Sequence, residues 1–375
     1  MSSELRVASG EDHLLLKGAA GKRGTAVRSD CWIEISRENA LPVARSPLPG
    51  ESEEKSLITD HSSLITNNLL IKSKVGSLYG SAIKKQMEEL AAYFKLEGVT
   101  ITIEDAGALP FVIAARFEAA VKRMNPAVTD EFLMPFLDAN VPATAKNRLR
   151  RSRLYLPGNE PKFFVNAGLH GPDGVILDLE DSVSPDEKDA ARHLVRNALR
   201  SVNFYGAERM VRINQLPMGL EDLKFVVPHK VNLILIPKVE EADQVVAVEK
   251  EVLTLKAKHG IEDDIWFMPI IESAKGAINA FAIASASKFV CSLAIGLEDY
   301  TADIGAERTL EGTESFWARM QVVNAAKAAG IQAIDSVFSD VGDMDGLVKS
   351  TLESKSYGFE GKGCIHPRQI QPIHT

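Results

Sequence analysis

From Leu149 onward, short apolar runs alternate with longer amphipathic stretches, and this alternation constrains the fold more than any other feature of the sequence. The apolar runs are SRLYLP, GVILDLE, RMVRIN, VNLILIPK, IWFMPIIE, FVCSLAIG, IQAIDSVFS and GKGCIHP. Nearly continuous apolar strands are typical of a parallel sheet that is buried on both faces. Eight strands separated by helices predict an α/β fold of the (β/α)8 type, a TIM barrel, over residues 149–375.

An open, doubly wound sheet is the alternative that fits the same alternation. No Gly-x-Gly-x-x-Gly follows the first strand, which disfavours a dinucleotide-binding fold and a dehydrogenase. The sequence ends at Thr375, soon after the eighth strand, so we expect the C-terminal helix of the barrel to be missing.

The first 130 residues have a different texture and predict a small α+β domain. AVRSDCWIEIS, NLLIKSKV and GVTITIEDAG are expected strands, and the last shows the strict alternation of a half-buried strand. Helices are expected at about residues 81–94 and 110–124. Residues 40–66 are rich in Pro, Ser, Gly and charge, which predicts a loop insertion in a lengthened hairpin. Residues 131–148 are expected to link the two domains.

Charge and cysteine usage exclude several classes of protein. Asp and Glu number 51 against 43 Lys and Arg, giving a formal net charge of −8, which argues against a nucleic-acid partner. No apolar stretch is long enough to span a membrane, and the start MSSELRVASGEDH resembles neither a secretory nor a transit peptide. Cys31, Cys291 and Cys364 lie far apart, as expected in a reducing cytoplasm.

The carboxyl ends of the expected barrel strands carry polar side chains, where catalytic groups of such barrels lie. Carboxylates that gather at neighbouring strand ends are typical of a divalent cation bound by oxygen, most simply Mg²⁺. The polar residues at these ends are Asp178, Glu180, Asp181, Arg212, Asn214, Lys238, Glu272, Glu298, Asp299, Asp335 and His366.

Each of these residues also has a structural alternative. Asp181 precedes a helical pattern and could be an N-cap, and His366 precedes a proline and is more simply a structural histidine. Lys238 could contact a substrate or pair with a carboxylate. Arg212 favours function, because it lies inside an apolar strand and needs an anion there. Glu272 favours function as well, since it ends the apolar strand IWFMPIIE.

The ordered segments RSRLYLPGNEPKFF, DLEDSVSPDEKDAAR, VRIN, LIPKVE, PIIES, AIGLEDYTADIG and GKGCIHPRQI resemble the citrate lyase β-subunit family. That family belongs to the wider group of HpcH/HpaI aldolases and citramalyl-CoA or malyl-CoA lyases. The resemblance runs from about Leu149 to the end and implies a Mg²⁺-dependent retro-Claisen cleavage.

Carried onto this sequence, the resemblance implies a role for each strand end. Glu272 and Asp299 would be the metal ligands, and Arg212 would bind the carboxylate and carbonyl oxygen of the oxo-acid product. Glu180 and Asp181 would order the waters of the metal. Main-chain groups from Gly296 through Leu297 and Glu298 to Asp299 would hold the product carboxylate, and Lys238 would contact the substrate.

The N-terminal region carries a second resemblance. GTAVRSDCWIEI and SLYGSAIKKQMEELAAYFKLEGVTITIEDAGALPFVIAARFEAAVKRM are similar to the citrate lyase γ subunit, an acyl carrier protein. The resemblance implies a phosphoribosyl-dephospho-coenzyme A group on Ser29, within the pattern Gly24-Thr25-x-x-x-Ser29-Asp30. The alternative is an ordinary turn serine.

Together the two resemblances imply a fusion of acyl carrier and lyase, which splits a citryl thioester into oxaloacetate and an acetyl thioester. The expected partners are a citrate lyase α subunit, the acyltransferase, and further copies of the chain in a trimer or larger assembly. Two alternatives stay open. One is a citramalyl-CoA or malyl-CoA lyase that uses free coenzyme A esters. The other is a non-catalytic carrier and scaffold subunit, because the family's C-terminal segment that closes the active site does not follow IHPRQI.

Overall fold

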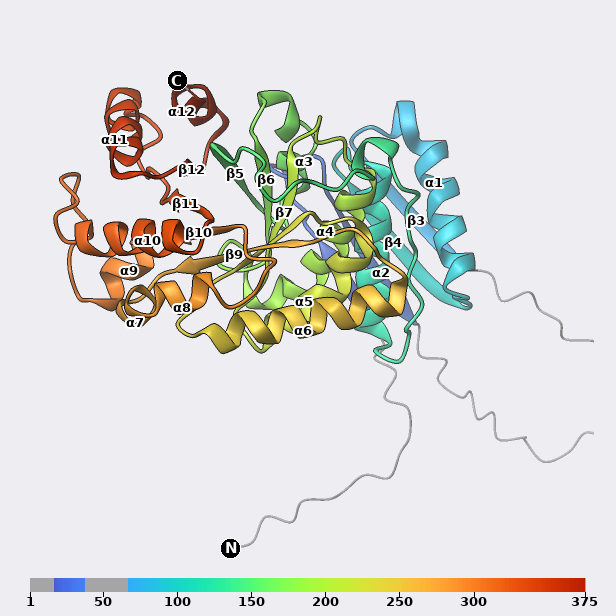
Figure 1. Ribbon diagram of the computed structural model, residues 1–375. Helices are drawn as coiled ribbons and strands as arrows, with labels where there is room; N and C mark the ends of the chain where they lie inside the picture. The colour runs from blue at the N-terminus through green and yellow to red at the C-terminus, as the bar shows by residue number, and fades with distance from the viewer. Residues whose placement is uncertain (1–16, 38–66, 375) are drawn as a thin grey trace, which may run out of the picture. The chain divides into compact units, whose positions relative to one another are not determined.

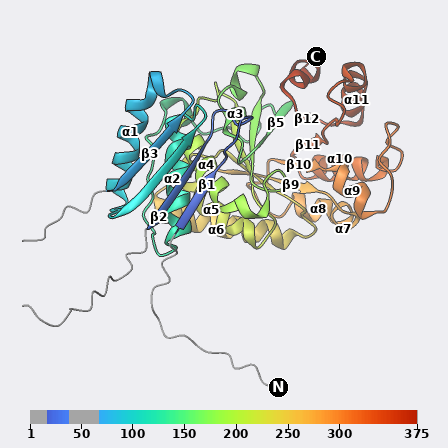
Figure 2. The ribbon, with the colours of Figure 1, turned by 180° about the vertical axis from the view of Figure 1, so that it is seen from behind.

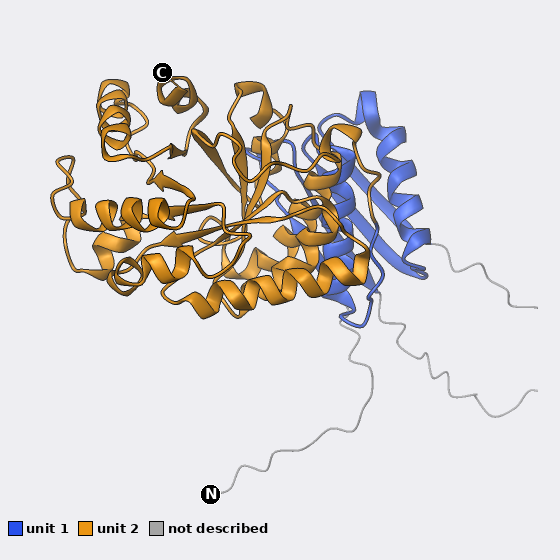
Figure 3. Cartoon of the chain, viewed as in Figure 1, with its two compact units in different colours: residues 1–132 blue, residues 133–375 orange. Residues whose placement is uncertain are grey.

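The computed structural model describes residues 17–37 and 67–374. The chain divides into two compact units, Met1–Phe132 and Leu133–Thr375, which Figure 3 colours separately. The expected insertion at residues 40–66 lies outside the described residues.

The first unit is a four-stranded sheet with two helices (Figure 2). The strand order is β1-β2-β4-β3, in which β2 is antiparallel to β1 and β4 while β3 runs parallel to β4. Strand β1 was not predicted from the sequence. The elements are β1 (Lys17–Gly21), β2 (Cys31–Arg37), β3 (Asn68–Ser73), α1 (Gly76–Tyr93), β4 (Val99–Asp105) and α2 (Pro110–Met124).

The core of this unit follows from the alternation of β2 and β4. Ile33 and Ile35 of β2 and Ile101 and Ile103 of β4 are buried, while the residues between them are half-buried. Helix α2 packs on β1 and β2, and α1 packs on β3. The expected strands and helices are confirmed, although α1 begins before residue 81.

The expectation of a lengthened hairpin was wrong. The segment of residues 38–67 joins β2 to β3, but these strands do not pair, because β4 lies between them. A hairpin needs two neighbouring antiparallel strands. The connection therefore leads from an inner strand to an edge strand.

The second unit is a closed barrel of eight parallel strands, in the order β10-β11-β12-β5-β6-β7-β8-β9 (Figure 1). Every expected apolar run forms its strand, and the predicted TIM barrel is confirmed. The strands are β5 (Ser152–Pro157), β6 (Gly174–Asp178), β7 (Glu208–Arg212), β8 (Leu233–Ile236), β9 (Trp266–Ile271), β10 (Ser292–Ile295), β11 (Gln332–Asp335) and β12 (Gly361–Cys364).

Helices follow the strands and bury their apolar faces against the barrel. They are α3 (Pro161–Phe164), α4 (Lys188–Ser201), α5 (Met218–Val226), α6 (Ala242–His259), α7 (Ala274–Ile278), α8 (Ala280–Ala284), α9 (Leu297–Asp303), α10 (Phe316–Ala328), α11 (Met344–Tyr357) and α12 (Ile370–His374). Single 3₁₀ turns lie at η1 (Asp138–Asn140), η2 (Ala167–His170), η3 (Pro185–Glu187), η4 (Val227–His229) and η5 (Pro367–Gln369).

The expectation that no helix follows the last barrel strand needs a correction. Helix α12 comes after β12, is five residues long and packs against β5 and β12. Its His374 Nε2 lies 2.7 Å from the Ser152 hydroxyl at the start of β5. Within the described ranges, no helix is both long enough and apolar enough for a membrane span.

Candidate active site

A cavity of about 450 Å³ opens at the carboxyl ends of the barrel strands. Side chains from non-adjacent parts of the sequence meet here because the carboxyl ends of parallel strands lie at one end of a barrel. The charged residues that line the cavity are Arg153, Asp178, Asp181, Arg212, Glu272, Glu298, Asp299 and Asp335.

Arg212 ends β7, and Asp178 ends β6 directly beside it in register. Asp178 accepts two hydrogen bonds from the guanidinium, 2.7 Å from Nε and 2.8 Å from Nη2. Burial would raise the pKa of Asp178, but the bonds from Arg212 outweigh it and hold the pKa below its usual value. Burial would likewise lower the pKa of Arg212, yet Asp178 raises it overall. The pair is therefore charged and fixed in orientation.

Three further charged residues surround this pair. Arg212 Nη1 lies 2.7 Å from Glu180 Oε2 and 3.3 Å from Asp181 Oδ2. Lys238 Nζ lies 3.5 Å from Glu180 Oε1, 3.6 Å from Asp181 Oδ1 and 3.8 Å from Asp299 Oδ1. Asp181 thus contacts two cations, and no backbone N–H in the described ranges donates a capping hydrogen bond to its side chain. Burial raises the pKa of Glu180, although Arg212 opposes this.

Glu272 follows β9 and is almost fully buried. Its Oε2 accepts a hydrogen bond of 2.9 Å from the backbone N–H of Lys238. Burial raises the pKa of Glu272 to about 8. Gly296 makes room for this carboxylate, because a Cβ at that position would stand 2.5 Å from Glu272 Oε1.

Asp299 lies in the first turn of α9, which starts directly after β10 and Gly296. The N–H of Gly296 donates to the Ile271 carbonyl, and the N–H of Leu297 donates to the Ser336 hydroxyl. Within the described part of the chain, the N–H groups of Glu298 and Asp299 have no acceptor. The Glu298 side chain turns to Arg308 and Ser339. Of the four expected main-chain donors, two therefore bond within the protein, and the N–H groups of Glu298 and Asp299 have no acceptor in the described residues.

The donor set fits a magnesium ion. Mg²⁺ commonly keeps several waters and takes one or two protein carboxylates. Glu272 and Asp299 supply such a pair at neighbouring strand ends, and both line the cavity. Among residues 17–37 and 67–374, no three His, Cys, Asp or Glu side chains are grouped closely enough to hold an ion by themselves.

Asn214 and His366 lie outside this arrangement. The side chain and N–H of Asn214 bond to Asp222. His366 Nδ1 accepts from the N–H of Arg368, which is a structural role.

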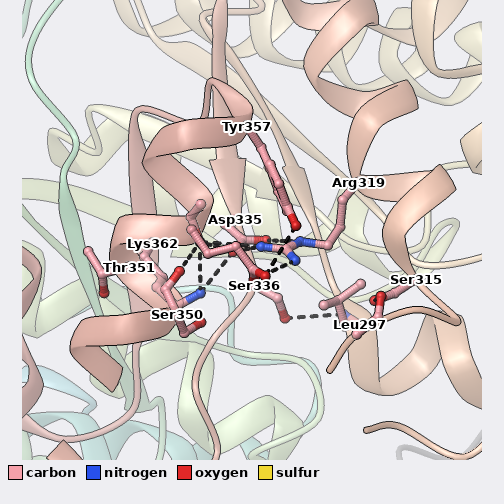
Figure 4. A network of polar contacts seen from close by, with 12 residues as sticks. Leu297, Ser315, Arg319, Asp335, Ser336, Ser350, Thr351, Tyr357 and Lys362 are labelled. Carbon is pink, nitrogen blue, oxygen red and sulfur yellow. Dashed lines mark hydrogen bonds and ion pairs between the residues drawn. The ribbon is translucent and has the colours of Figure 1, made fainter. Parts of the chain in front are cut away.

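Asp335 lines the cavity, but its carboxylate is bound by cations of the fold. Figure 4 shows Arg319 and Lys362 converging on its carboxylate. Lys362 Nζ lies 2.8 Å and Arg319 Nη2 lies 3.0 Å from Oδ2, and Ser354 donates to the same oxygen. Asp335 is thus neutralised within the fold.

Sequence reasoning missed the roles of Asp178 and Tyr155 and the cavity-lining Arg153. Asp178 was noted at a strand end but not as the partner of Arg212, although the pairing of neighbouring strands could have indicated it. Tyr155 of β5 also faces the site, and its ring centroid lies 5.4 Å from Arg212 Cζ.

In the first unit, Ser29 lies in the loop between β1 and β2. It is half-buried and has a φ of +53°, in the left-handed region that few residues other than glycine adopt. Its N–H donates to the Ala106 carbonyl at 3.0 Å, and the N–H of Ala106 donates back to Asp30. Lys74 Nζ donates to the carbonyls of the preceding residues, Gly24, Thr25 and Val27.

Asp30, directly after Ser29, is buried against Arg116. Arg116 donates from Nε to Asp30 Oδ1 at 3.0 Å and from Nη2 to Oδ2 at 2.8 Å. Asp30 also accepts from the N–H of Cys31. These contacts and Lys74 hold the Ser29 loop in a defined shape.

Comparison with known proteins identifies the family. The sequence model of HpcH/HpaI aldolase/citrate lyase matches residues 151–367, which is more than half of the chain. The chain belongs to this family. The membership confirms the expected resemblance and the class of carbon–carbon lyases. A second model, an acyl carrier family described as malonate decarboxylase delta subunit, matches residues 61–124 and confirms a carrier-like unit in the same chain. That match does not include Ser29.

Three similar proteins cover about 60% of this chain. Citrate lyase subunit beta of Leuconostoc mesenteroides subsp. cremoris is 40% identical over 230 residues, covering 60% of this chain and 76% of the relative. The Escherichia coli K12 protein of that name is 38% identical over 233 residues, covering 61% and 77%. Human mitochondrial citramalyl-CoA lyase is 33% identical over 237 residues, covering 60% and 69%.

Solved structures agree. The citrate lyase beta subunit of Mycobacterium tuberculosis, complexed with oxaloacetate and magnesium, has a TM-score of 0.51 at 27% identity, covering 63% of this chain and 97% of that one. A complex of protein CitE from the same organism with magnesium and pyruvate has a TM-score of 0.51 at 28% identity, covering 61% and 90%.

Proposed function

We propose that this protein cleaves a citryl thioester into oxaloacetate and an acetyl thioester, with the acyl group carried on phosphoribosyl-dephospho-coenzyme A at Ser29. Residues 1–130 would be the carrier domain, 131–148 the linker and 149–375 the lyase. The observation that carries the proposal is the presence, on one chain, of an acyl-carrier family match and a lyase barrel with an acidic cavity.

In this proposal Glu272 and Asp299 hold Mg²⁺, which supplies Lewis-acid stabilisation to the hydroxyl and carboxylate oxygens of the substrate when bound. The high pKa of Glu272 reflects burial, and a cation beside it would favour the ionised form. Gly296 keeps the space that this carboxylate needs.

Arg212 has the geometry of a carboxylate-binding residue. Asp178 occupies its Nε–Nη2 edge and fixes the orientation of the guanidinium, while Nη1 contacts Glu180 and Asp181. In this proposal the Nη1 side would exchange these carboxylates for the carboxylate and carbonyl oxygen of the oxo-acid. Glu180 and Asp181, held by Arg212 and Lys238, would orient water near the metal, and Lys238 would also contact the substrate.

The bond between the hydroxyl-bearing carbon and the thioester α-carbon breaks in the reaction. The hydroxyl loses its proton and becomes the ketone, while the bonding electrons pass to the thioester enolate, which then takes up a proton. Charge therefore moves across the cavity, and fixed N–H donors and cations stabilise it. The open N–H groups of Glu298 and Asp299, with the main chain of Gly296 and Leu297, would hold the product carboxylate.

The carrier arm would deliver its own thioester to a barrel on the same or a neighbouring chain. Tethering raises the effective concentration of the substrate at the site. A citrate lyase α subunit would load the citryl group by acyl transfer, and the assembly would be a cytoplasmic trimer or larger oligomer.

The test is the intact mass of the protein from its native host, compared with a Ser29→Ala variant. A mass increment that matches phosphoribosyl-dephospho-coenzyme A and disappears in the variant supports the carrier, and Mg²⁺-dependent release of oxaloacetate from the citryl form supports the reaction. Unmodified Ser29 with cleavage of free citramalyl-CoA or malyl-CoA would replace it with the coenzyme A lyase alternative. Protein that assembles with partners but cleaves no thioester would be a scaffold.

A further inference from the structure

Arg153 is a buried cation within the barrel. It is the second residue of β5, is 1% exposed, and lines the same cavity as Arg212. Its side chain crosses the barrel interior, because Nη1 lies 2.9 Å from the sulfur of Met268 on β9, the strand opposite β5 in the barrel order. Nη2 lies 3.4 Å from the carbonyl oxygen of Asp335.

The partners of Arg153 are poor for a guanidinium. A thioether sulfur is a weak acceptor, and Nε has no acceptor among the residues that the structure describes. No carboxylate in the described ranges forms an ion pair with Arg153. The carboxylate of Asp335 is already bound by Arg319 and Lys362. Burial correspondingly lowers the pKa of Arg153.

A buried charge of this kind calls for an anion. Leaving a guanidinium in a low-dielectric site without a carboxylate is costly, and proteins keep such groups where a ligand supplies the opposite charge. Arg153 is a planar donor suited to a carboxylate or phosphate.

The neighbours of Arg153 in register are glycines whose Cβ positions are filled by side chains from other strands and loops. Its partners in register are Gly174 on β6 and Gly363 on β12, so neither neighbouring strand places a side chain beside it. A Cβ on Gly363 would stand 2.6 Å from Val337 Cγ1, in the wall of the cavity. Ala294, another small residue, also lines the cavity.

Arg153 also lies deeper in the barrel than Arg212. Tyr155, whose ring is beside Arg212, is two residues further along β5 and faces the same side. Two residues of a strand span roughly 7 Å, which is about the length of a short dicarboxylate. The backbone of Arg153 therefore lies about that distance deeper in the barrel than the level of Arg212.

We propose that Arg153 is a specificity-determining residue that binds a second carboxylate of the substrate at the floor of the cavity. The inference rests on the proposed lyase function and adds the residue that selects its substrate. A citryl thioester carries a carboxymethyl group where a citramalyl thioester carries a methyl group, and its oxo-acid product has two carboxylates rather than one. Arg153 is placed to receive the additional carboxylate, so it selects substrates that release a dicarboxylic oxo-acid.

The test compares Arg153→Met, Arg153→Lys and the control Arg151→Met. Arg151 precedes β5 and forms a partly exposed pair with Asp173, remote from the cavity lining. The full chain is titrated calorimetrically with oxaloacetate and with pyruvate in Mg²⁺. Wild type is expected to bind oxaloacetate more tightly. In Arg153→Met this preference is expected to fall on the order of 100-fold, since a site built for a polar group rejects analogues strongly. Arg153→Lys should restore part of it, and Arg151→Met should keep it.

Thermal unfolding of the ligand-free proteins separates this role from a structural one. Arg153→Met should unfold no lower than wild type, because it removes a buried charge that has no ion-pair partner. A much lower unfolding temperature, with equal losses for both oxo-acids, would make Arg153 structural and overturn the proposal. Wild type that binds pyruvate as tightly as oxaloacetate would also overturn it. A clear oxaloacetate preference that depends on Arg153, in a protein that cleaves no thioester, would leave the inference standing and reject the proposed reaction.

Discussion

The carboxylate of Asp178 binds the guanidinium of Arg212 through two hydrogen bonds, 2.7 Å from Nε and 2.8 Å from Nη2. The two residues end neighbouring strands in register, so the barrel itself sets their separation. Asp178 thereby decides which face of Arg212 meets a ligand, and the pair forms the fixed side of the candidate active site.

Arg212→Lys should lose most of the lyase activity. An ammonium cannot keep both bonds to Asp178 and also offer a planar pair of donors to an oxo-acid. We expect kcat/KM for thioester cleavage to fall on the order of 100- to 1000-fold. Steady-state kinetics with Lys224→Met as a surface control would measure this, and near-normal kinetics would show that Arg212 is structural.

Asp299→Asn should weaken metal activation without unfolding the barrel. The side chain is partly exposed, so its charge contributes little to stability, but its oxygen is one of two proposed protein ligands. The Mg²⁺ concentration for half-maximal activity is expected to rise on the order of 100-fold. The exposed Asp345→Asn, in α11, is the matched control. Unchanged Mg²⁺ dependence would remove Asp299 from the metal site.

Gly296→Ala should displace the Glu272 carboxylate. The added Cβ would stand 2.5 Å from Oε1 and 2.7 Å from Cγ, so the side chain must move. We expect loss of Mg²⁺-dependent activity and destabilisation of about 1–3 kcal/mol. Gly80→Ala in α1 adds a methyl group where no atom lies within 4 Å and should cause neither change. Calorimetric Mg²⁺ titration and urea unfolding measure the two effects, and a variant that binds Mg²⁺ normally would contradict this account.

Asp335→Asn should destabilise the barrel at neutral pH. Burial would raise the pKa of Asp335, but the charges of Lys362 and Arg319 outweigh it and hold the pKa well below its usual value. Without the negative charge of Asp335, the buried cations Lys362 and Arg319 lose their counter-ion. The free energy of unfolding is therefore expected to fall by about 3–5 kcal/mol. Urea unfolding at pH 7 measures it. Glu353→Gln, which removes a half-exposed partner of Arg319, should cost below about 1 kcal/mol.

The stability difference between wild type and Asp335→Asn should also depend on pH, with a sign that follows from the lowered pKa. A carboxylate with a depressed folded pKa stabilises the fold above its unfolded pKa of about 3.9 and loses this effect as the pH falls toward the folded value. The difference between wild type and Asp335→Asn should therefore shrink by about 1 kcal/mol between pH 7 and pH 3. A difference that grows in acid would contradict the ion-pair assignment.

The barrel could be predicted because its strands are apolar throughout and its helices are amphipathic. Strand β1 could not, since KGAAG lacks the β-branched and aromatic residues that mark a strand. The small residues of β1 allow helix α2 to pack closely against the strand, and the sequence pattern does not indicate this contact. A Cβ on Gly18 would stand 2.1 Å from the Ala120 carbonyl of α2. The order β1-β2-β4-β3 depends on pairing between distant segments, which periodicity does not encode.

Part of the candidate site could likewise be predicted from the sequence, and part could not. The strand-end rule placed Glu272 and Arg212 at one end of the barrel, with Glu180 beside Arg212, because position in a parallel strand can be read from the sequence. It could not tell that Asp335 binds cations of α10 and β12. Arg153 was missed because it lies within a strand rather than at its end.

The strand order of the first unit also indicates where the protein can be engineered. Arg37 and Asn68 flank the same end of β4, since Arg37 pairs with Val99 and Asn68 with Thr100. Two interstrand spacings, about 10 Å, therefore separate the ends of the 38–67 connection. The entropic cost of closing a loop rises only with the logarithm of its length, so a reporter peptide inserted there should cost below about 1 kcal/mol. An affinity tag or fluorophore site at this connection would report on the Ser29 domain without altering its sheet.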